Sequence, residues 1–465
     1  MKMEFNPTDL QKKIANIICF HSRCIIRADC GIGKTSAMLM AIKHLLKTKT
    51  ITKVLICAPI SVAQIVWPGE LEQWEIFEEI SCKVFAGSTV TEEIALPDTE
   101  ISIVNYEQLS KIKKLIRKKV IYDMIIFDEI SYLKSAGSER MDGAKNLADV
   151  ARRVIGLTAT PLSKSYLDLW CPVRVVDHGL RLGKAFYRYR DSYFKETRPK
   201  SFKFTITEGS KEIIQKKIKD LFFSFSSKNW ESKEFKTYVS LPPEVMKLHN
   251  DIRKNYCSNW HGSQIIALST AQLLNKLEQI TGGSVIAEGR WTQLNRASIF
   301  LHDKKLEALA KICDAYISTG ESGVLVAYRY MDEADMIQEY LGDRFGKVVV
   351  YTSLPAKKRK EVVDQWNNRE IQIILAHPKS ASHGLCLQWG GHVVVWYGLA
   401  ITWEEYKQYN GRLMRPGQKE KVLIYNLLAK DSIDELSFDR IITRKNTAEE
   451  FLKYLHSSAP RRTLI

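Results

Sequence analysis

Short apolar runs recur through the first third of the chain, separated by amphipathic stretches. Each run is a few residues long and rich in Val, Ile and Leu, which predicts buried β-strands at residues 24–26, 53–59, 101–106, 122–129 and 153–157. Apolar residues at helical spacing predict helices at residues 10–18, 37–42, 60–67 and 111–119, with Thr8 and Ser61 as N-caps. Strands that alternate with helices indicate a doubly wound parallel sheet up to about Trp170.

The same alternation returns in the last third of the chain, with strands predicted at residues 323–328, 347–351, 371–376, 392–396 and 421–425. It is absent from Cys171 to about Phe300, where a strong helix is predicted at residues 271–280. The expected fold class is therefore α/β, with two lobes that each contain a parallel sheet flanked by helices. A mainly helical insertion and linker is expected between them. The expected domain boundaries are residues 1–175, 176–300 and 301–465.

Residues 25–36 have the order of strand, glycine-containing turn and helix that a phosphate-binding loop requires. Gly31 and Gly33 let the backbone wrap closely, so that N–H groups point at phosphate oxygens, and the next helix N-terminus adds a favourable dipole. The Lys34 ammonium can reach the β- and γ-phosphates, and the Thr35 hydroxyl can hold Mg²⁺. Ala28 stands where the strict pattern begins with Gly. The residues expected to contact the nucleotide here are Cys30, Gly31, Ile32, Gly33, Lys34, Thr35 and Ser36.

Two carboxylates, Asp128 and Glu129, end the strand predicted at residues 122–129. Ligands of an open parallel sheet bind at such strand ends. Asp128 is therefore predicted to hold Mg²⁺, and Glu129 to orient and deprotonate an attacking water. The alternative is a solvated acidic turn, and the upstream phosphate loop argues against it.

Three further polar residues each have two interpretations. Gln11 either reads an adenine edge, because an amide offers a donor and an acceptor together, or lies on a solvated helix surface. Thr158 and Thr160 either bridge the nucleotide site to a bound polymer or form a capped turn.

The second lobe contains no second Gly-Lys-Thr loop, so it is expected to complete the site of the first lobe. Arg412 and Arg415 are three residues apart, which predicts that they share one helix face. From there they can act on the γ-phosphate as arginine fingers. The alternative is two surface arginines on a helix.

Composition narrows the class of partner. The formal net charge of +16 over 465 residues favours a polyanion, nucleic acid before membrane, although a generally basic surface is the alternative. Residues 181–203 mix cations with aromatics, which suits either base stacking or a packed helical subdomain. The nine cysteines form no Cys-x-x-Cys pair, so no zinc site or disulfide framework is expected, and reduced thiols suit the cytoplasm. Neither a signal core nor an apolar run long enough for a bilayer is found.

The order of these segments resembles helicase superfamily two, specifically the Swi/Snf-type ATP-dependent DNA translocases. The resemblance covers nearly the whole chain and departs from the family pattern at Ala28, Ser131 and Ala159. Residues 388–392 and 396–399 look most like short versions from bacteriophages and bacteria. The segments that carry the resemblance are residues 28–35, 54–74, 128–131, 157–161, 168–170, 383–387 and 408–418.

The resemblance implies two RecA-like lobes with ATP and Mg²⁺ between them. Lys34, Asp128 and Glu129 would act from one side, and Arg412, Arg415 and Gln408 from the other, with Gly384 near the nucleotide. Closure on ATP and opening on hydrolysis would move the lobes along DNA. The implied DNA contacts, mainly to the backbone, are Pro59, Ile60, Ser61, Asn105, Tyr106, Thr158, Thr160, Arg329 and Thr352.

The function predicted from the sequence is nucleic-acid-stimulated ATP hydrolysis coupled to movement along DNA. One alternative is an RNA-directed helicase of the same superfamily, against which residues 415–418 and the Trp67 segment argue. The other is a non-hydrolysing, basic DNA-binding recruitment protein, which only Ala28 and Ser131 support. A replication, recombination or nuclease partner is expected, and no membrane. The expected location is the cytoplasm, that of the bacterial host if a phage encodes the chain.

Overall fold

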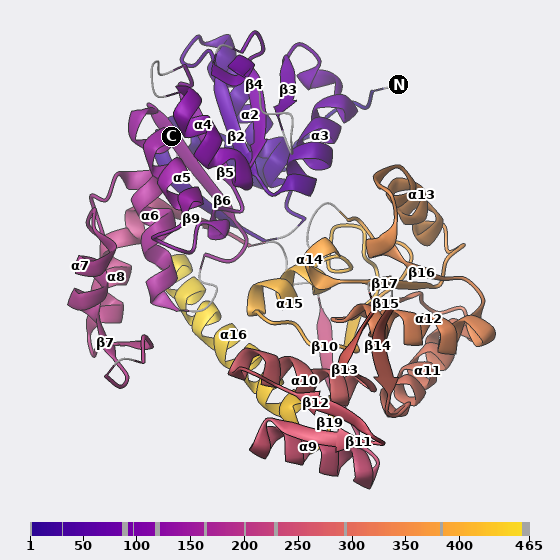
Figure 1. Ribbon diagram of the computed structural model, residues 1–465. Helices are drawn as coiled ribbons and strands as arrows, with labels where there is room; N and C mark the ends of the chain where they lie inside the picture. Colours follow the sequence, from indigo (N-terminus) through magenta and orange to yellow (C-terminus); the bar gives the residue numbers. More distant parts are fainter. Residues whose placement is uncertain are drawn as a thin grey trace. The chain divides into compact units, whose positions relative to one another are not determined.

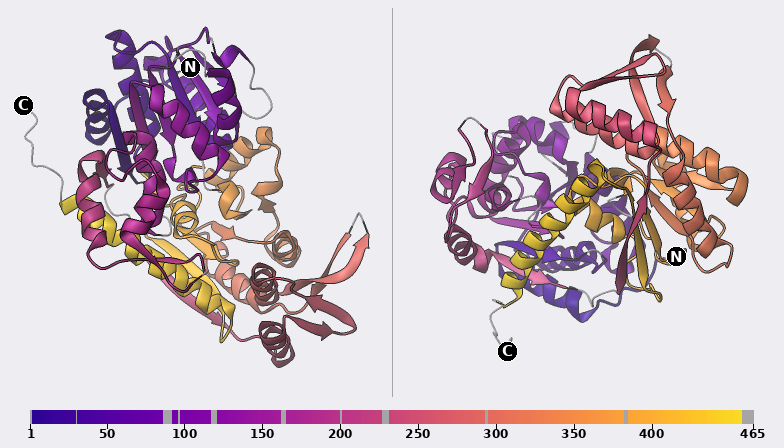
Figure 2. Two further views of the ribbon diagram at one scale, coloured as in Figure 1. Left: turned by 60° about the vertical axis from the view of Figure 1, so that its left-hand side comes forward. Right: turned by 90° about the horizontal axis from the view of Figure 1, so that it is seen from below.

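The computed structural model describes residues 2–29, 31–85, 92–95, 97–116, 121–161, 165–199, 201–226, 231–292, 295–381 and 385–457. The chain divides into two compact units (Figures 1 and 2). Unit 1 comprises Met1–Lys228 and Arg444–Ile465, and unit 2 comprises Asn229–Thr443. Each unit is built around its own parallel β-sheet.

The sheet of unit 1 has seven strands in the order β3-β4-β2-β5-β6-β1-β9, and every neighbouring pair is parallel. All five strands predicted in this part of the chain are confirmed. The strands are β1 (Arg23–Ala28), β2 (Val54–Ala58), β3 (Cys82–Phe85), β4 (Ile101–Asn105), β5 (Met124–Asp128), β6 (Arg153–Thr158) and β9 (Phe222–Phe225). Because the strands are parallel, the loops after β1, β2, β4, β5 and β6 all leave from one edge of the sheet.

Helices cover both faces of this sheet, which explains why its strands are apolar without alternation. Ile25 and Ile125 face one hydrophobic cluster with α4, α5 and α6, while their neighbours Ile26 and Ile126 face another with α1, α2 and α3. The helices are α1 (Asp9–Phe20), α2 (Lys34–Lys47), α3 (Trp67–Gln73), α4 (Leu109–Ile116), α5 (Glu139–Val150), α6 (Trp170–Asp177), α7 (Phe186–Tyr193) and α8 (Ser210–Ile218).

The sheet of unit 2 has six parallel strands in the order β10-β19-β18-β15-β17-β16. The five strands predicted for the last third of the chain are confirmed here, as β15 (Val324–Ala327), β16 (Val348–Val350), β17 (Ile373–Ala376), β18 (Val393–Trp396) and β19 (Val422–Ala429). The helices that follow or connect them are α11 (Lys304–Ile317), α12 (Met331–Phe345), α13 (Ala356–Asn367), α14 (Pro378–Ala381), α15 (Trp403–Asn410) and α16 (Ile433–Ser457).

The sequence predicts a mainly helical segment between the two lobes, and this prediction is wrong. Besides α9 (Pro243–Asn255) and α10 (Thr270–Gly282), this segment contributes β9 to the first sheet and β10 (Ser232–Val239) to the second. Three antiparallel hairpins pair β7 (Phe194–Glu196) with β8 (Phe204–Ile206), β11 (Cys257–Trp260) with β12 (Ser263–Ile266), and β13 (Ser284–Thr292) with β14 (Asn295–Phe300). Five of these strands are only three or four residues long, and β10 is mostly exposed, so long apolar runs do not mark them in the sequence.

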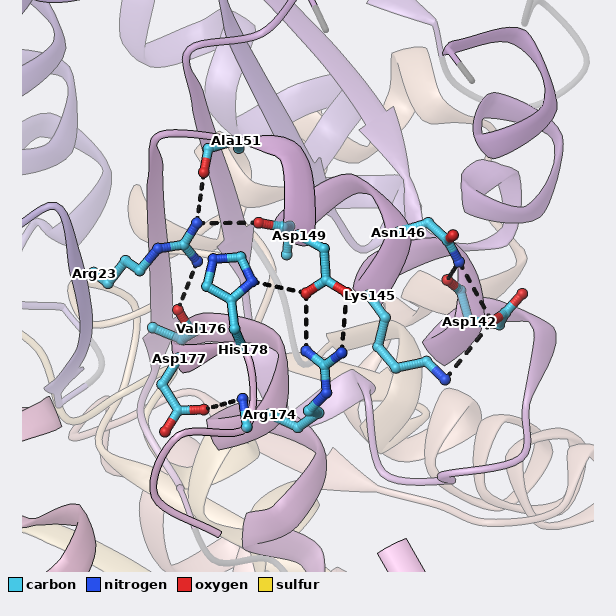
Figure 3. Close-up of polar contacts among 12 residues, drawn as sticks. Arg23, Asp142, Lys145, Asn146, Asp149, Ala151, Arg174, Val176, Asp177 and His178 are labelled. Atoms are coloured by element: carbon cyan, nitrogen blue, oxygen red, sulfur yellow. Dashed lines mark hydrogen bonds and ion pairs between the residues drawn. The ribbon is translucent and has the colours of Figure 1, made fainter. Parts of the chain in front are cut away.

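A polar network joins β1, α5 and α6 at the end of β1 opposite the phosphate loop (Figure 3). The Arg23 guanidinium donates to the carbonyl oxygens of Val176 at 2.8 Å and Ala148 at 3.1 Å, near the C-terminal ends of the two helices. Arg174 donates two hydrogen bonds to the Asp149 carboxylate, at 2.9 and 3.0 Å. Burial tends to raise the pKa of Asp149, but Arg174 and His178 outweigh it and hold this pKa below its usual value. We interpret the network as structural, because its charged groups are bonded to one another or to helix-end carbonyl oxygens.

Among the described residues, no helix is both long and apolar enough to cross a membrane.

Candidate nucleotide site

The turn between β1 and α2 has the geometry of a phosphate-binding loop. Gly31 and Gly33 have φ angles of 81° and 80°, which a residue with a Cβ adopts only with strain. A Cβ on Gly33 would also lie 2.2 Å from Nε2 of Gln11. Ala28 needs no such freedom, because it is the last residue of β1 and pairs with Phe225 in extended conformation. The departure from Gly at this position is therefore compatible with the loop.

Lys34 is the first residue of α2, and its ammonium folds back over the loop. Its Nζ donates to the carbonyl oxygens of Ala28 at 2.9 Å and Asp29 at 3.1 Å. A phosphate with negatively charged oxygens is a stronger acceptor than these carbonyls, so the same ammonium can turn to it. Cys30, which the sequence placed among the nucleotide contacts, lies outside the described residues.

The two carboxylates predicted at the end of β5 lie at the same sheet edge. Asp128 and Glu129 are 7% and 8% exposed, and Glu129 has a φ of 52°, so the chain turns sharply directly after the strand. Burial raises the pKa of Asp128, while the nearby Lys34 ammonium, a hydrogen bond from Trp67 and a backbone N–H oppose the rise. The Trp67 indole donates to Asp128 Oδ2 at 3.0 Å, and the Tyr106 hydroxyl donates to the Asp128 carbonyl at 2.8 Å. The backbone and the side chain of Asp128 are thus both held in place.

Gln11 is buried against the loop, so its interpretation as a solvated surface residue is wrong. It also has a role that the sequence analysis missed. Its Oε1 accepts from Thr8 N at 2.9 Å, and the Thr8 hydroxyl accepts from Gln11 N at 3.2 Å, which forms a capping box at the start of α1. Thr8 is the N-cap that was predicted. The Thr-x-x-Gln spacing is the sequence signature of a capping box, so this role could have been predicted.

Ser36 and Thr35 differ in what surrounds them. The Ser36 hydroxyl donates to Glu70 Oε2 at 2.8 Å, and Trp74 Nε1 donates to the same oxygen at 2.8 Å, so the Ser36 side chain ties α2 to α3. Thr35 is half-buried at the start of α2. Its hydroxyl and the Asp128 carboxylate are hard oxygen donors of the kind that Mg²⁺ takes as ligands.

One prediction is wrong for residues 408–418 of unit 2, which we call the arginine segment. Arg412 and Arg415 do not share a helix face, because α15 ends at Asn410 and both residues lie in the turns that follow. The nearby Gly411, Pro416 and Gly417 explain this ending, since glycine and proline favour turns over helix.

The two arginines are nonetheless held in the same way. Arg412 Nε donates to the Gln408 carbonyl and Arg415 Nε to the Gly411 carbonyl, both at 3.0 Å. Arg412 is 3% exposed, whereas Arg415 is half-buried with its Nη1 3.0 Å from Cys386 Sγ. Gln408 is buried, and Gly384 lies outside the described residues.

Comparison with known protein families agrees with this geometry. Residues 14–198 match the SNF2-related domain, and residues 304–417 match the helicase conserved C-terminal domain. The first match contains the loop and both carboxylates, and the second contains both arginines. This chain belongs to the Swi/Snf-type group of helicase superfamily two. The two matched domains together show that this chain is an ATP hydrolase.

Individual relatives come from phage, bacteria and eukaryotes. The Swi/Snf-type chain is 29% identical to the putative protein p41 of Acyrthosiphon pisum secondary endosymbiont phage 1, over 94% of this chain and 95% of that protein. It is 24% identical to the uncharacterized ATP-dependent helicase MG018 of Mycoplasma genitalium, over 92% of this chain but only 40% of that protein. Among solved structures, it is similar to the Sulfolobus solfataricus SWI2/SNF2 ATPase core in complex with dsDNA, at 18% identity over 98% of this chain and 96% of that one, with a TM-score of 0.45. At that score the likeness adds nothing to the argument for the fold.

Most residues predicted to contact DNA from unit 1 of this Swi/Snf-type chain are buried. Asn105, Tyr106, Thr158 and Thr160 are at most 3% exposed. Thr160 N donates to the Thr158 hydroxyl at 3.0 Å, as the capped-turn interpretation expected. These residues support the strand ends and do not form an exposed contact surface.

The segment after β2 does reach the surface. Ile60 is 47% exposed and Ser61 is half-buried, while Pro59 is buried. Ser61 is not a helix N-cap, since its φ and ψ of −65° and −35° are helical and its side chain accepts no capping bond. The helix continues as a π-helix, Val62–Val66, directly before Trp67. Single π turns are rare and often occur at functional positions.

The predicted DNA contacts of unit 2 are both engaged with protein groups. Arg329 Nη1 forms an ion pair with Glu278 Oε2 at 2.9 Å, and the Thr352 hydroxyl accepts from His377 N at 3.0 Å. Glu278 lies on α10, far from Arg329 in sequence, so no local sequence pattern predicts this ion pair.

Glu333 completes a buried charged cluster around Arg329. Its Oε2 accepts from Arg329 N at 2.7 Å, and Lys305 pairs with Asp434 at 2.7 Å beside it. With Glu333 neutral, the two cations are balanced by Glu278 and Asp434. Burial raises the pKa of Glu333 to about 7, although backbone N–H groups and Lys305 oppose the rise.

We expect unit 2 to lose stability as the pH rises from about 4.5 through about 7, because the unfolded chain releases the Glu333 proton more readily than the folded chain does. The shift corresponds to at most about 3 kcal/mol. Glu333→Gln keeps an acceptor for Arg329 N without the charge, so it should remove this loss and be more stable than the wild type at pH 8. Urea unfolding of both proteins across this pH range tests the expectation. The control is Glu339→Gln, which changes an exposed residue on the same helix. Equal pH profiles for Glu333→Gln and the wild type would contradict the expected role of Glu333.

Proposed function

We propose that this protein is a DNA-stimulated ATP hydrolase that couples hydrolysis to movement along DNA. The observation that carries the proposal is the convergence of Lys34 with the carboxylates of Asp128 and Glu129 at one sheet edge, in a chain of the Swi/Snf-type family. A cationic side chain, a magnesium ligand and a general base are the groups that phosphoryl transfer to water requires.

In the proposed mechanism each residue of the site has one task. Lys34 and the N–H groups of the loop neutralise the phosphates, and Thr35 and Asp128 hold Mg²⁺. The ion, when bound, offsets the charge that develops on the phosphate oxygens. Glu129 takes a proton from the attacking water. Arg412 and Arg415 stabilise the negative charge of the phosphoryl group in transfer, with Gln408 beside them.

Trp67 is a direct link between the proposed DNA contact and the proposed magnesium ligand. Its indole donates to Asp128, and the exposed Ile60 and the half-buried Ser61 begin the same helical segment. A shift of this segment on DNA would therefore displace the Asp128 carboxylate or its hydrogen-bond partner. This connection supports coupling of polymer binding to hydrolysis.

The net charge of +16 supports a nucleic-acid partner bound mainly through its backbone. Such contacts have little sequence preference, which suits a motor that must move along any sequence.

Steady-state ATP hydrolysis tests the proposal, measured without polymer and with single-stranded DNA, duplex DNA or single-stranded RNA. We expect DNA to raise the rate at least several-fold and magnesium chelation to abolish hydrolysis. Stimulation by RNA alone would contradict the proposal in favour of an RNA-directed helicase. Hydrolysis in no condition, with DNA binding retained, would contradict it in favour of a DNA-binding recruitment protein.

A further inference from the structure

A pocket of about 200 Å³ lies at the amino ends of β17, β18 and β19 in unit 2, directly beside the arginine segment. Four residues of the segment at 388–392, which looks phage-like in sequence and which the proposed ATP site does not use, line one part of it: Gln388, Trp389, Gly391 and His392. Arg369, Gly417, Gln418, Lys419 and Glu420 line the remainder.

Trp389 is presented rigidly at this pocket. Its side chain is 53% exposed, while Gln388 on one side and Gly390 and Gly391 on the other are buried. A Cβ on Gly390 would lie 2.3 Å from the Trp366 carbonyl oxygen, and one on Gly391 would lie 2.3 Å from that of Gly323. The backbone around Trp389 is therefore packed against its neighbours, so the indole is exposed without a flexible loop. Such preorganisation lowers the entropic cost of binding.

Gly417 supports the indole from the arginine segment. It has a φ of 98°, and a Cβ there would lie 2.8 Å from Trp389 Nε1. Both facts require glycine at this position, and together they keep space for an aromatic ring beside the segment.

The polar groups of the pocket suit a ligand that is negatively charged and carries a hydrogen-bond donor. Among the described residues, Arg369 and Lys419 form no ion pair, and Glu420 is the only carboxylate in the lining. Gln388 is 6% exposed, and its Oε1 accepts no hydrogen bond from the described part of the chain. A buried acceptor without a donor is costly, so a ligand that supplies an N–H group gains from binding there.

We propose that this pocket binds one unpaired nucleotide of a DNA strand. The base stacks on Trp389 and donates an N–H group to Gln388 Oε1, while Arg369 and Lys419 contact its phosphates. A paired base cannot stack in this way, because its faces are covered by its neighbours in the duplex. The proposal takes DNA as the polymer from the proposed function and adds a site for a single-stranded region.

The pocket is also connected to the arginine segment by hydrogen bonds. Gln418 Nε2 donates to the carbonyl oxygens of Gln388 and Gly391, both at 3.0 Å, and Gln388 Nε2 donates to that of Pro416 at 3.3 Å. A bound nucleotide therefore changes the surroundings of the segment that carries Arg415. In this way an unpaired region of the DNA affects residues proposed to act in hydrolysis.

Fluorescence anisotropy of a labelled single-stranded oligothymidylate and of a labelled blunt-ended duplex without unpaired nucleotides tests the proposal on the full-length protein. We expect Trp389→Ala to weaken oligothymidylate binding about tenfold and leave duplex binding unchanged, because one base–aromatic stack is lost. Trp389→Phe should keep most of the affinity. Tyr340→Ala removes an exposed aromatic ring elsewhere in unit 2 and is the matched control.

Unchanged oligothymidylate binding by Trp389→Ala would overturn the inference, and so would an equal loss on single strand and duplex. Binding of a labelled oligoglutamate that depends on Trp389, without such dependence for oligothymidylate, would overturn it in favour of an acidic protein partner. Failure of the proposed function has a different signature, namely no stimulation of ATP hydrolysis by any DNA, whatever residue stands at position 389.

Discussion

Lys34→Ala is expected to reduce kcat for ATP hydrolysis about 10²- to 10³-fold, because the loop loses the ammonium group that lies over it. ATP affinity should fall as well, since the ammonium contacts the bound phosphates before hydrolysis begins. DNA binding should persist, because Lys34 contributes one of many positive charges. Lys47→Ala, at the exposed end of the same helix, is the matched control and should behave as the wild type.

Glu129→Gln is expected to reduce kcat about 10²- to 10⁴-fold through a different step, the loss of a general base. Glutamine has nearly the same shape and keeps the turn after β5, so ATP affinity should be preserved. The two variants are therefore distinguished by ATP binding, measured with a fluorescent ATP analogue, alongside hydrolysis in saturating DNA. Near-normal turnover in either variant would contradict the assignment of the site. Lost ATP binding in Glu129→Gln would contradict the role given to this carboxylate.

Arg415→Ala is expected to reduce kcat about 10³- to 10⁵-fold, the range found for arginine fingers, with little change in ATP affinity. The reason is that the guanidinium stabilises charge that appears only in the transition state. Arg415 is half-buried, and within the described part of the chain its Nε and Nη1 bond to a carbonyl oxygen and to the Cys386 sulfur. Truncation should therefore leave unit 2 folded. Arg412 is a less suitable probe, because at 3% exposure its truncation also disturbs packing.

Arg359→Ala is the matched control for Arg415→Ala. Arg359 is likewise half-buried in unit 2 and donates through Nε to a local carbonyl, that of Leu354 at 3.1 Å, but it lies outside the arginine segment. Pre-steady-state hydrolysis with saturating ATP and DNA separates the chemical step from product release. A raised KM with unchanged kcat in Arg415→Ala would show that this residue binds the nucleotide and does not act as a finger.

Much of the architecture was predictable because it depends on local patterns. Ten strands were expected from short apolar runs, and each is present in one of the two parallel sheets. Such runs are diagnostic here because both faces of the first sheet are covered, so successive residues such as Ile25 and Ile26 are buried on opposite sides. The phosphate loop and the two carboxylates after β5 were predictable for a similar reason, since the positions of glycine, lysine and strand-end acids are local in sequence.

Other features depended on contacts between distant segments. The edge strands β3, β9 and β10 were missed because an edge strand is stabilised by pairing with a neighbour more than by its own apolar residues. The hydrogen bond from Trp67 to Asp128 and the ion pair between Arg329 and Glu278 join different elements. The prediction of a shared helix face relied on the spacing of the two arginines. The turn-forming residues after Asn410 instead predict that α15 ends before Arg412.

For this protein, the sequence by itself determined the two parallel sheets, the loop and the order of the chemically important residues, because each is a property of a few neighbouring positions. Only the tertiary structure decided which of those side chains are free to act. It buried Tyr106 and Thr158 behind the strand ends, paired Arg329 with an acid, and left Trp389 exposed beside the arginine segment. Exposure and pairing depend on which surfaces meet in the folded chain, and no local pattern contains that information.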